Sequence, residues 1–376
     1  MNREEALEHF KEHEVKQRQL ASLLALEAFF QTNKDRLAED FQRSFQTICR
    51  LISEQQLVGE KKRIGHLSFS MLRTELLVGR PFYLIEATDE EWIFDEEPYL
   101  ASYDASWAFS FLNEMISELT ERAKTYMGTI TLPDIDRIKL EEAANFHQYV
   151  VSLARYALPW AVNCKEYIEL EKEEELEIRI GEYFDCSEVV YKEDQTEKDS
   201  AEIKEWLEEK LEDEYPYEVF ANLQLSEGNY EETDLRYTDF RKSDLSQSSL
   251  NGCLLIGANL TGSNLTNSDL SNSFIHEANF SGSVLRQANF SEIEGASGLV
   301  DSSTWEMPGY LPVLFEGADL EGANFEGADV RGASFLGASL QNVNFSGANL
   351  DGAIFSKDAK GILRLNAQQQ SSVIWK

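Results

Sequence analysis

Large apolar residues recur at every fifth position in the C-terminal part of the chain. The stretch FEGADLEGANFEGADVRGASFLGASL, residues 315–340, shows this pattern without interruption. Five residues turn an α-helix by roughly 500°, and strand side chains alternate between two faces, so neither element keeps a period of five on one side. A constant inward direction therefore requires a corner between successive anchors. Four such sides would form a coil of about 20 residues that pairs with the next coil at the strand spacing.

The same pattern extends over much of the second half of the chain. Anchors at multiples of five run from Tyr230 to Phe290 and again from Phe315 to Phe355, which makes 13 + 9 = 22 positions. A small residue usually stands two places before each anchor, and Asn or Asp often stands between them. We expect the anchors to fill the core of the coil, including Leu260, Leu265, Leu270, Phe280, Phe290, Phe315, Leu320, Phe325, Phe335, Phe345 and Phe355.

These residues resemble the pentapeptide-repeat family, whose motif is a small residue, Asn or Asp, Leu or Phe, and two variable positions. The segments ANLTGSNLTNSDLSN (258–272) and ADLEGANFEGADVRGASFLGASL (318–340) follow this motif almost without exception. The resemblance implies a right-handed quadrilateral β-helix over residues 228–357, interrupted at 291–314. Residues 215–227 are then a linker or an N-terminal cap of the solenoid. Residues 358–376 abandon the repeat and are interpreted as a C-terminal cap or a dimerisation segment.

Residues 1–214 carry patterns of regular secondary structure instead of the repeat, and they resemble no family. The apolar periodicities predict an acidic, mainly helical α+β domain with short β-hairpins. Helices are expected at 3–31, 33–57, 104–127, 134–169 and 198–213, with a hairpin within 64–94 and two short strands within 176–191.

The interruption at 291–314 allows two interpretations. It keeps the phase of five but loses the small and Asx positions, so it is either a projecting loop or a degenerate coil packed inside. A loop would expose an unusual apolar area, which commonly marks a contact with a partner. The residues that would form this contact are Trp305, Met307, Tyr310 and Leu311.

Three apolar residues stand at positions that should point away from the core. Leu254, Ile256 and Phe274 flank anchors one coil apart and should stack on one face, with His276 beside them. If a strict 20-residue register continued through the interruption, Leu314, Leu336 and Ile354 would join this column. Either the N-terminal domain covers this face, or it is a surface for a partner or for a homodimer.

Charge and cysteine content restrict the classes of function. The net charge of −34 repels nucleic acid and anionic membranes, so we expect direct binding to neither. The four cysteines lack the spacing of metal ligands, the apolar runs are too short to span a bilayer, and the charged start MNREEALEHFKEHE does not resemble a signal peptide. A cytoplasmic protein without a cofactor is the simplest interpretation.

Candidate catalytic chemistry is sparse. His9 and His13 stand four residues apart on an expected helix, a spacing that can hold a metal, but a solvated helix face is the favoured interpretation and no metal site is predicted. The chain contains no GxSxG, HExxH, P-loop or dinucleotide-binding motif. The sequence therefore predicts a protein that is not an enzyme; an enzyme within residues 1–227 is the least favoured alternative.

Two functions are compatible with this sequence. The first is a non-enzymatic scaffold or regulator that binds a protein partner through the acidic solenoid. The alternative follows from the resemblance, since one branch of the family mimics DNA, binds DNA gyrase and gives inhibitor resistance or self-immunity; gyrase or topoisomerase IV would then be the partner. DNA mimicry predicts acidic side chains on one face and a projecting loop, whereas a scaffold predicts an exposed apolar column.

Overall fold

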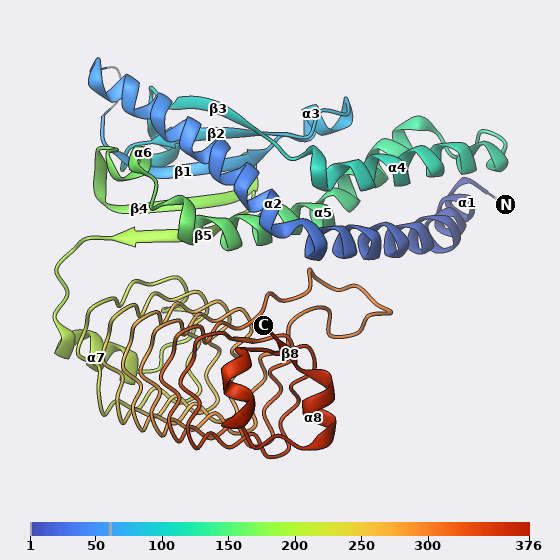
Figure 1. Ribbon diagram of the computed structural model, residues 1–376. Coiled ribbons are helices and arrows are strands. Elements are labelled where there is room, and N and C mark those ends of the chain that lie inside the picture. Colours follow the sequence, from blue (N-terminus) through green and yellow to red (C-terminus); the bar gives the residue numbers. More distant parts are fainter. Residues whose placement is uncertain (1, 60–61) are drawn as a thin grey trace. The chain divides into compact units, whose positions relative to one another are not determined.

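The computed structural model describes residues 2–59 and 62–376. The chain divides into two compact units (Figure 1). The first comprises Met1–Gln195 together with Leu299–Pro308, and the second comprises Thr196–Gly298 and Gly309–Lys376. The boundary thus lies at residue 195 and not at 214, because helix α7 (Ser200–Glu208) packs against the first coils of the second unit.

A long helical segment opens the first unit. Helix α1 (Arg3–Phe10), a π-helical turn η1 (Lys11–Val15) and helix α2 (Lys16–Leu57) follow one another directly. The expected break near residue 32 is wrong. Thr32 Oγ1 and Asn33 Nδ2 donate hydrogen bonds to the backbone carbonyls four residues before them, both at 2.8 Å, so these polar side chains are accommodated within the helix. The remaining helices are α3 (Arg73–Leu77), η2 (Trp92–Phe94), α4 (Ser106–Ala123), η3 (Lys124–Tyr126), α5 (Leu132–Ala161) and α6 (Lys165–Ile168).

A five-stranded sheet lies beside these helices, with strand order β3-β2-β1-β4-β5. Strand β1 pairs antiparallel with β2 and parallel with β4, which is about 100 residues away along the chain. The expected hairpin within 64–94 is present as β1 and β2, but helix α3 lies between the two strands. The last residues of that expected segment form the 3₁₀ turn η2 and not part of a strand. Strand β3 lies outside the strands expected from the sequence. The strands are β1 (Ile64–Met71), β2 (Phe82–Thr88), β3 (Tyr99–Asp104), β4 (Lys172–Glu182) and β5 (Ser187–Asp194).

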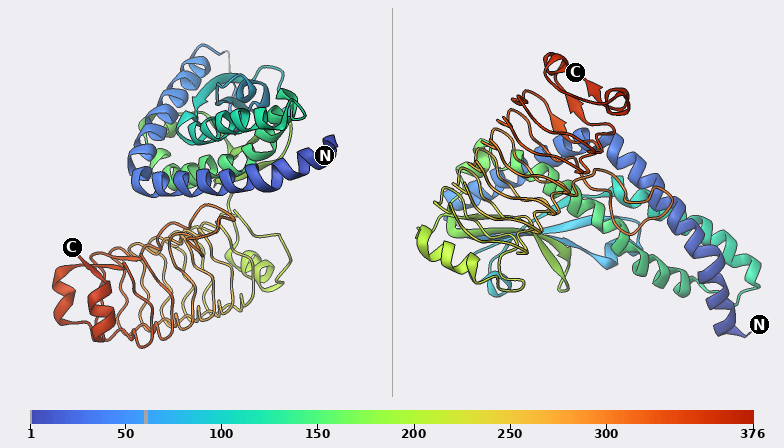
Figure 2. Two further views of the ribbon diagram at one scale, coloured as in Figure 1. Left: turned by 90° about the vertical axis from the view of Figure 1, so that its right-hand side faces the viewer. Right: turned by 90° about the horizontal axis from the view of Figure 1, so that it is seen from below.

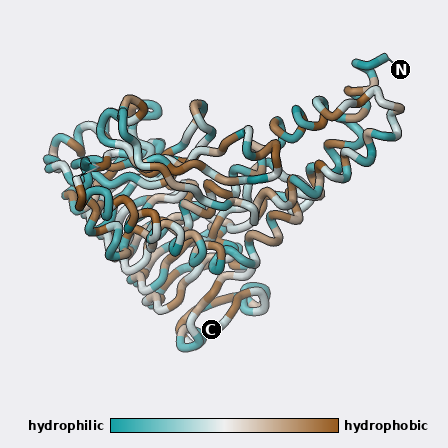
Figure 3. Tube along the Cα trace, turned by 90° about the horizontal axis from the view of Figure 1, so that it is seen from above, coloured by the Kyte–Doolittle hydropathy of each residue, from teal (hydrophilic) through white to brown (hydrophobic). Residues whose placement is uncertain are grey.

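One face of this sheet packs against helices α2, α4 and α5. Buried and partly exposed residues alternate along β1 and β2, so Phe69 and Tyr83 point toward the helices. Phe69 contacts Phe41 of α2 with ring centroids 5.9 Å apart, and Tyr83 contacts Phe109 of α4 at 6.3 Å. Hydrophobic and hydrophilic colours alternate along the helices in Figure 3, as expected for helices with one buried face.

The second unit is a solenoid of stacked coils (Figure 2). Parallel β-bridges join residues 20 positions apart, and each coil contributes one bridge to each of four ladders. We number these ladders by one member each: the first contains Asn259, the second Asn264, the third Asp269 and the fourth Phe274. Residues two places after the anchors turn the corners with positive φ, such as 67° at Gly257 and 58° at Asn267, where Gly and Asn are favoured.

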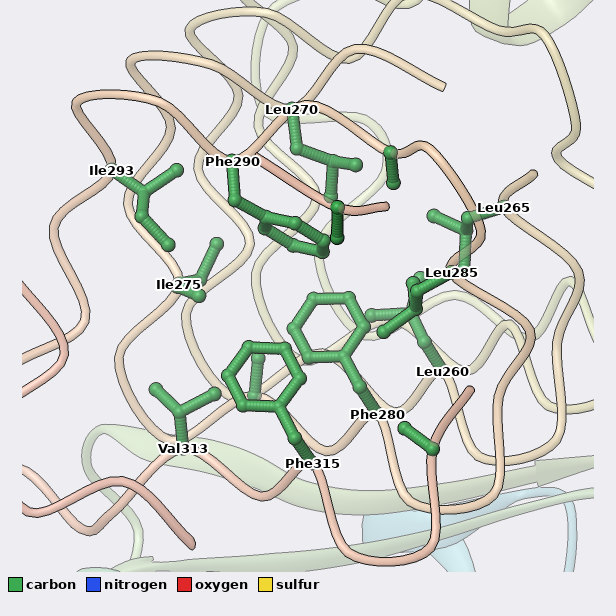
Figure 4. Close-up of a cluster of buried hydrophobic side chains, with 14 of the residues drawn as sticks. Leu260, Leu265, Leu270, Ile275, Phe280, Leu285, Phe290, Ile293, Val313 and Phe315 are labelled. Carbon is green, nitrogen blue, oxygen red and sulfur yellow. The ribbon is translucent and has the colours of Figure 1, made fainter. Parts of the chain in front are cut away.

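Phenylalanine columns fill the interior of the solenoid (Figure 4). Phe280 and Phe315 stack with ring centroids 5.1 Å apart and planes 8° apart, and Phe290 and Phe325 stack at 4.7 Å. The anchors from Leu260 onward are at most 3% exposed. Those named from the sequence are all buried: Leu260, Leu265, Leu270, Phe280, Phe290, Phe315, Leu320, Phe325, Phe335, Phe345 and Phe355.

The interruption of the repeat is an inserted loop. The bridge from Asn279 leads to Leu314, 35 positions away rather than 20, so 15 additional residues separate these coils. Gly298 and Tyr310 form an antiparallel bridge with two backbone hydrogen bonds of 2.7 and 3.1 Å at the base of the loop. Leu314, and with it Leu336 and Ile354, therefore lies along the first ladder and not in one column with Phe274; the 20-residue register fails at this insertion.

Helices and a short strand close the two ends of the solenoid. At its start, Trp206 of α7 packs on Tyr215 and Phe220, with ring centroids 5.0 and 5.8 Å apart. At its end, strand β8 pairs with β7, and the buried Gln369 side chain donates to the backbone carbonyls of Phe345 and Ala348 at 2.8 and 2.9 Å. The elements of this end are β6 (Ser334–Phe335), β7 (Ile354–Phe355), η4 (Lys357–Gly361), α8 (Ala367–Ser372) and β8 (Ile374–Trp375).

Replacing Gln369 with leucine should weaken this end of the solenoid. Two buried carbonyls would lose their donor, which costs roughly 1–3 kcal/mol of local stability. Hydrogen exchange of peptides from residues 340–376 measures the effect. The neighbouring exposed Gln368 supplies the control, since its replacement by leucine removes no hydrogen bond to the coils. Equal protection in the two variants would contradict the capping role of Gln369.

Candidate interaction surface

An apolar patch lies along the fourth ladder of the solenoid. We define it by Leu254, Ile256, Phe274, His276 and Tyr310. Leu254 and Phe274 are joined by a parallel bridge, and the next members of the ladder on either side are the carboxylates Asp234 and Glu294. Phe274 is 37% exposed although the ladder positions are mostly polar. The patch therefore combines an exposed aromatic ring with an acidic border.

His276 and Tyr310 form the more rigid half of the patch. Their rings stack with centroids 4.1 Å apart and planes 14° apart, and His276 Nδ1 lies 2.9 Å from the Ala296 carbonyl. Burial lowers the pKa of His276, which favours the neutral ring with Nδ1 as the donor to this carbonyl. The bridge from Tyr310 to Gly298 fixes the tyrosine at the base of the inserted loop. This half of the patch is thus uncharged and positioned by backbone contacts.

The other residues selected from the sequence do not join the patch. Trp305 and Met307 lie in the segment that belongs to the first unit. The indole of Trp305 stacks on Tyr149 and donates a hydrogen bond of 2.8 Å from Nε1 to its hydroxyl, while Met307 is 44% exposed. Leu311 is buried in the solenoid, and its backbone N–H donates to Glu277 Oε1 at 2.9 Å.

Ion pairs distinguish the ladders by charge. Arginines bind neighbouring aspartates on the first, second and fourth ladders, for example Arg241 with Asp239 and Arg331 with Asp329. The third ladder has no Arg or Lys at its outward or corner positions between residues 229 and 347. The acidic side chains at those positions are Glu231, Glu232, Asp269, Glu292 and Glu326.

Metal-binding side chains do not cluster in the part of the chain that the structure describes. Over residues 2–59 and 62–376, no three His, Cys, Asp or Glu side chains are placed to hold a metal ion. The rings of His9 and His13 stack at 4.1 Å, and His9 Nδ1 lies 2.9 Å from the Tyr126 hydroxyl. Across the same described ranges, none of the helices has the length and apolarity that a membrane span requires.

One buried histidine predicts a pH dependence of stability in the first unit. Burial lowers the pKa of His147 to about 4, and Tyr83 Oη lies 2.7 Å from its Nδ1. Because the folded pKa is below the unfolded value of about 6.5, the stabilisation is complete above pH 6.5 and is lost as the pH falls toward 4.

The expected loss between pH 7 and pH 5 is roughly 1–2 kcal/mol, at about 1.4 kcal/mol per unit of pKa difference. Denaturant unfolding at the two pH values measures it. His147→Gln keeps an acceptor for the Tyr83 hydroxyl and should remove most of the difference. An unchanged pH slope in this variant would assign the dependence to other groups.

Comparison with known proteins places the coils in a family. The model of pentapeptide repeats matches eight copies, over residues 220–252, 233–272, 253–292 and 318–356. The C-terminal region contains pentapeptide repeats. The gap between 292 and 318 in these matches contains the inserted loop. A search of curated proteins gave no match.

Solved structures of pentapeptide-repeat proteins are similar to this chain at low identity. The plasmid-mediated fluoroquinolone resistance protein QnrB1 is 17% identical over 43% of this chain and 72% of its own, with a TM-score of 0.30. A pentapeptide-repeat protein of Nostoc PCC 7120 is 23% identical over 34% and 84%, with a TM-score of 0.15. HetL of the same organism, involved in regulating heterocyst differentiation, is 20% identical over 37% and 77%, also with a TM-score of 0.15. At these scores the likeness carries no functional argument.

Proposed function

We propose that this protein is a non-enzymatic scaffold or regulator that binds a protein partner through the apolar patch of its pentapeptide-repeat solenoid. The observation that carries the proposal is the exposed Phe274 ring on a ladder of otherwise mostly polar positions, supported from one side by Leu254. Exposed aromatic groups with a polar border are typical of the centres of protein interfaces. We further propose that the coil is right-handed and four-sided, with one ladder on each side.

A second candidate function is mimicry of DNA toward gyrase or topoisomerase IV. The acidic third ladder, which lacks basic residues, favours it. Six coils of this ladder extend over about 29 Å at the strand spacing, and duplex DNA of that length carries roughly 17 negative charges. The ladder contributes only five acidic side chains, so the apolar patch remains the better-supported surface.

Capture from an extract of the native host tests the first proposal. Immobilised full-length protein should retain a partner that Phe274→Asp fails to retain, because a charge would be placed at the centre of the interface. Val284→Asp is a matched control: Val284 has the same exposure of 37% and the same position before its anchor, but lies on the second ladder. If the Phe274→Asp protein retains the same partner as wild type, the patch is not the contact.

A supercoiling assay tests the second candidate. Under DNA mimicry, the full chain should inhibit purified DNA gyrase or protect it from a fluoroquinolone, and Glu326→Lys together with Asp269→Lys should abolish the effect by breaking the acidic ladder. A folded protein that leaves supercoiling unchanged at micromolar concentration excludes gyrase mimicry.

A further inference from the structure

A groove lies on the face of the N-terminal sheet opposite the helices. Its floor is formed by polar side chains of β1 and β2, which alternate with the buried residues of these strands. Its walls are the segment that carries Trp92 and Ile93, and the turn between β4 and β5 that carries Phe184. The cavity measures about 120 Å³, which would hold roughly four water molecules or one long side chain.

Two wall residues adopt an unusual backbone conformation. Trp92 and Phe184 have φ of 51° and 56°, in the left-handed region that costs a bulky residue of order 1–3 kcal/mol. Phe184 is nonetheless 82% exposed, so burial of its side chain does not offset the strain there. Trp92 is held in place by His66, whose ring stacks on it at 5.1 Å. The Phe184 ring meets the Tyr183 ring edge-on with centroids 4.3 Å apart, so both wall rings are held in place at the groove by neighbouring side chains.

The floor offers hydrogen-bond acceptors that nothing in the described chain uses. Thr88 is 94% buried, and its Oγ1 has no hydrogen-bond partner among residues 2–59 and 62–376. Glu86 is partly buried, and its carboxylate forms no hydrogen bond or ion pair with a residue in those ranges. Burial raises the pKa of Glu86, as expected for a carboxylate without a nearby cation. The Glu86 carboxylate and Thr88 Oγ1 could therefore both accept hydrogen bonds from a ligand group that enters the groove.

The charge of the residues that line the groove indicates the charge of the group that would bind there. Four carboxylates line the groove, at Glu86, Asp95, Glu182 and Asp185, together with the cation of Arg179. Arg73, outside the lining, forms ion pairs with Glu182 and Asp185, so two carboxylates are left in excess of the two arginines. The Arg179 cation is already engaged, since its Nη1 donates to Glu177 at 2.6 Å and its Nε donates to Ser187 at 3.1 Å. Its guanidinium also lies 5.1 Å from the centre of the Trp92 ring. The groove is therefore electronegative and already accommodates one arginine against an aromatic wall.

We propose that this groove binds a basic segment of a partner protein and inserts one arginine side chain between Trp92 and Phe184. The aliphatic stem would pack on the two rings, and the planar guanidinium would donate to Glu86 and to Thr88 Oγ1. Arginine fits better than lysine because its five donors in a fixed plane match a carboxylate and a hydroxyl together. This surface is separate from the solenoid patch, so the N-terminal unit would add a second binding site to the scaffold.

Titration of the full chain with a short labelled peptide of alternating arginine and valine tests this proposal. At 0.15 M salt, screening beyond about 8 Å limits general attraction to the acidic protein. Saturable binding is expected, with Glu86→Gln and Phe184→Ser about tenfold weaker and the lysine peptide weaker than the arginine peptide.

Glu174→Gln is the matched control, because it removes the same charge from an exposed position of β4 outside the groove. It should change the affinity by less than about twofold. The proposal is overturned if wild type shows no saturable binding, or if Glu86→Gln and Glu174→Gln weaken it equally. Circular dichroism confirms that each variant is folded.

Discussion

Replacing Phe325 with alanine is expected to destabilise the solenoid by about 3–5 kcal/mol, the range for removing a buried aromatic ring from a core. Phe325 is fully buried in the middle of one phenylalanine column, and it meets the neighbouring column edge-on. It stacks on Phe290 and Phe345 with centroids 4.7 and 5.2 Å apart and meets Phe315 edge-on at 5.5 Å. The surrounding coils are tied by backbone bridges, so they can close the resulting cavity only in part.

The measurement must separate the solenoid from the N-terminal unit. Hydrogen exchange of peptides from residues 315–345, followed at increasing denaturant, reports the stability of these coils alone. Phe274→Ala is the control, since it removes the same ring from a position that is 37% exposed and lies outside residues 315–345, so it should leave the protection of these peptides largely unchanged. A loss below about 1 kcal/mol in Phe325→Ala would contradict a core that depends on stacked phenylalanines.

The solenoid could be predicted from the sequence because its determinants are local. Each anchor, small residue and corner lies within five positions of the next, so a short stretch of sequence is enough to predict the geometry of a coil. The inserted loop could not be resolved in the same way. Val300, Trp305 and Tyr310 keep the phase of five, yet Val300 is 85% exposed and Trp305 contacts Tyr149 of the first unit. Phase alone does not distinguish an inward residue from one that binds elsewhere.

The N-terminal unit was only partly predictable because its order depends on contacts between distant residues. The parallel pairing of β1 with β4 joins Phe69 to Ile180, more than 100 positions away. Short strands such as β3 become strands through their neighbours more than through their own composition. Thr32 and Asn33 resembled a helix break, but their side chains bond to the helix backbone instead.

Five of the eight contact residues proposed from the sequence lie in the fourth-ladder patch, whereas Trp305, Met307 and Leu311 do not. Leu254, Ile256 and Phe274 were recognised because they violate the polar pattern of outward positions, and the fourth ladder brings them together. The groove in the first unit was missed, since its exposed rings come from two separate turns. Nothing in the sequence pattern predicts that Trp92 and Phe184 adopt a left-handed backbone conformation.

Phe274→Asp carries the largest expected effect on binding. An exposed aromatic residue at the centre of an interface commonly contributes about 2–4 kcal/mol, and an uncompensated carboxylate adds a desolvation cost. Glu294 borders the same ladder, so the new charge would also face a like charge, whereas Asp234 on the other side is paired with Arg236. The expected loss of affinity for the partner is therefore about 30-fold or more.

The dissociation constant of the purified partner for three full-length proteins tests the central claim most directly. Wild type and Val284→Asp should bind with affinities within about twofold of each other, because Val284 lies on another ladder. Phe274→Asp should bind about 30-fold more weakly or not at all. Equal affinities of the Phe274→Asp and Val284→Asp proteins would contradict binding through the fourth-ladder patch.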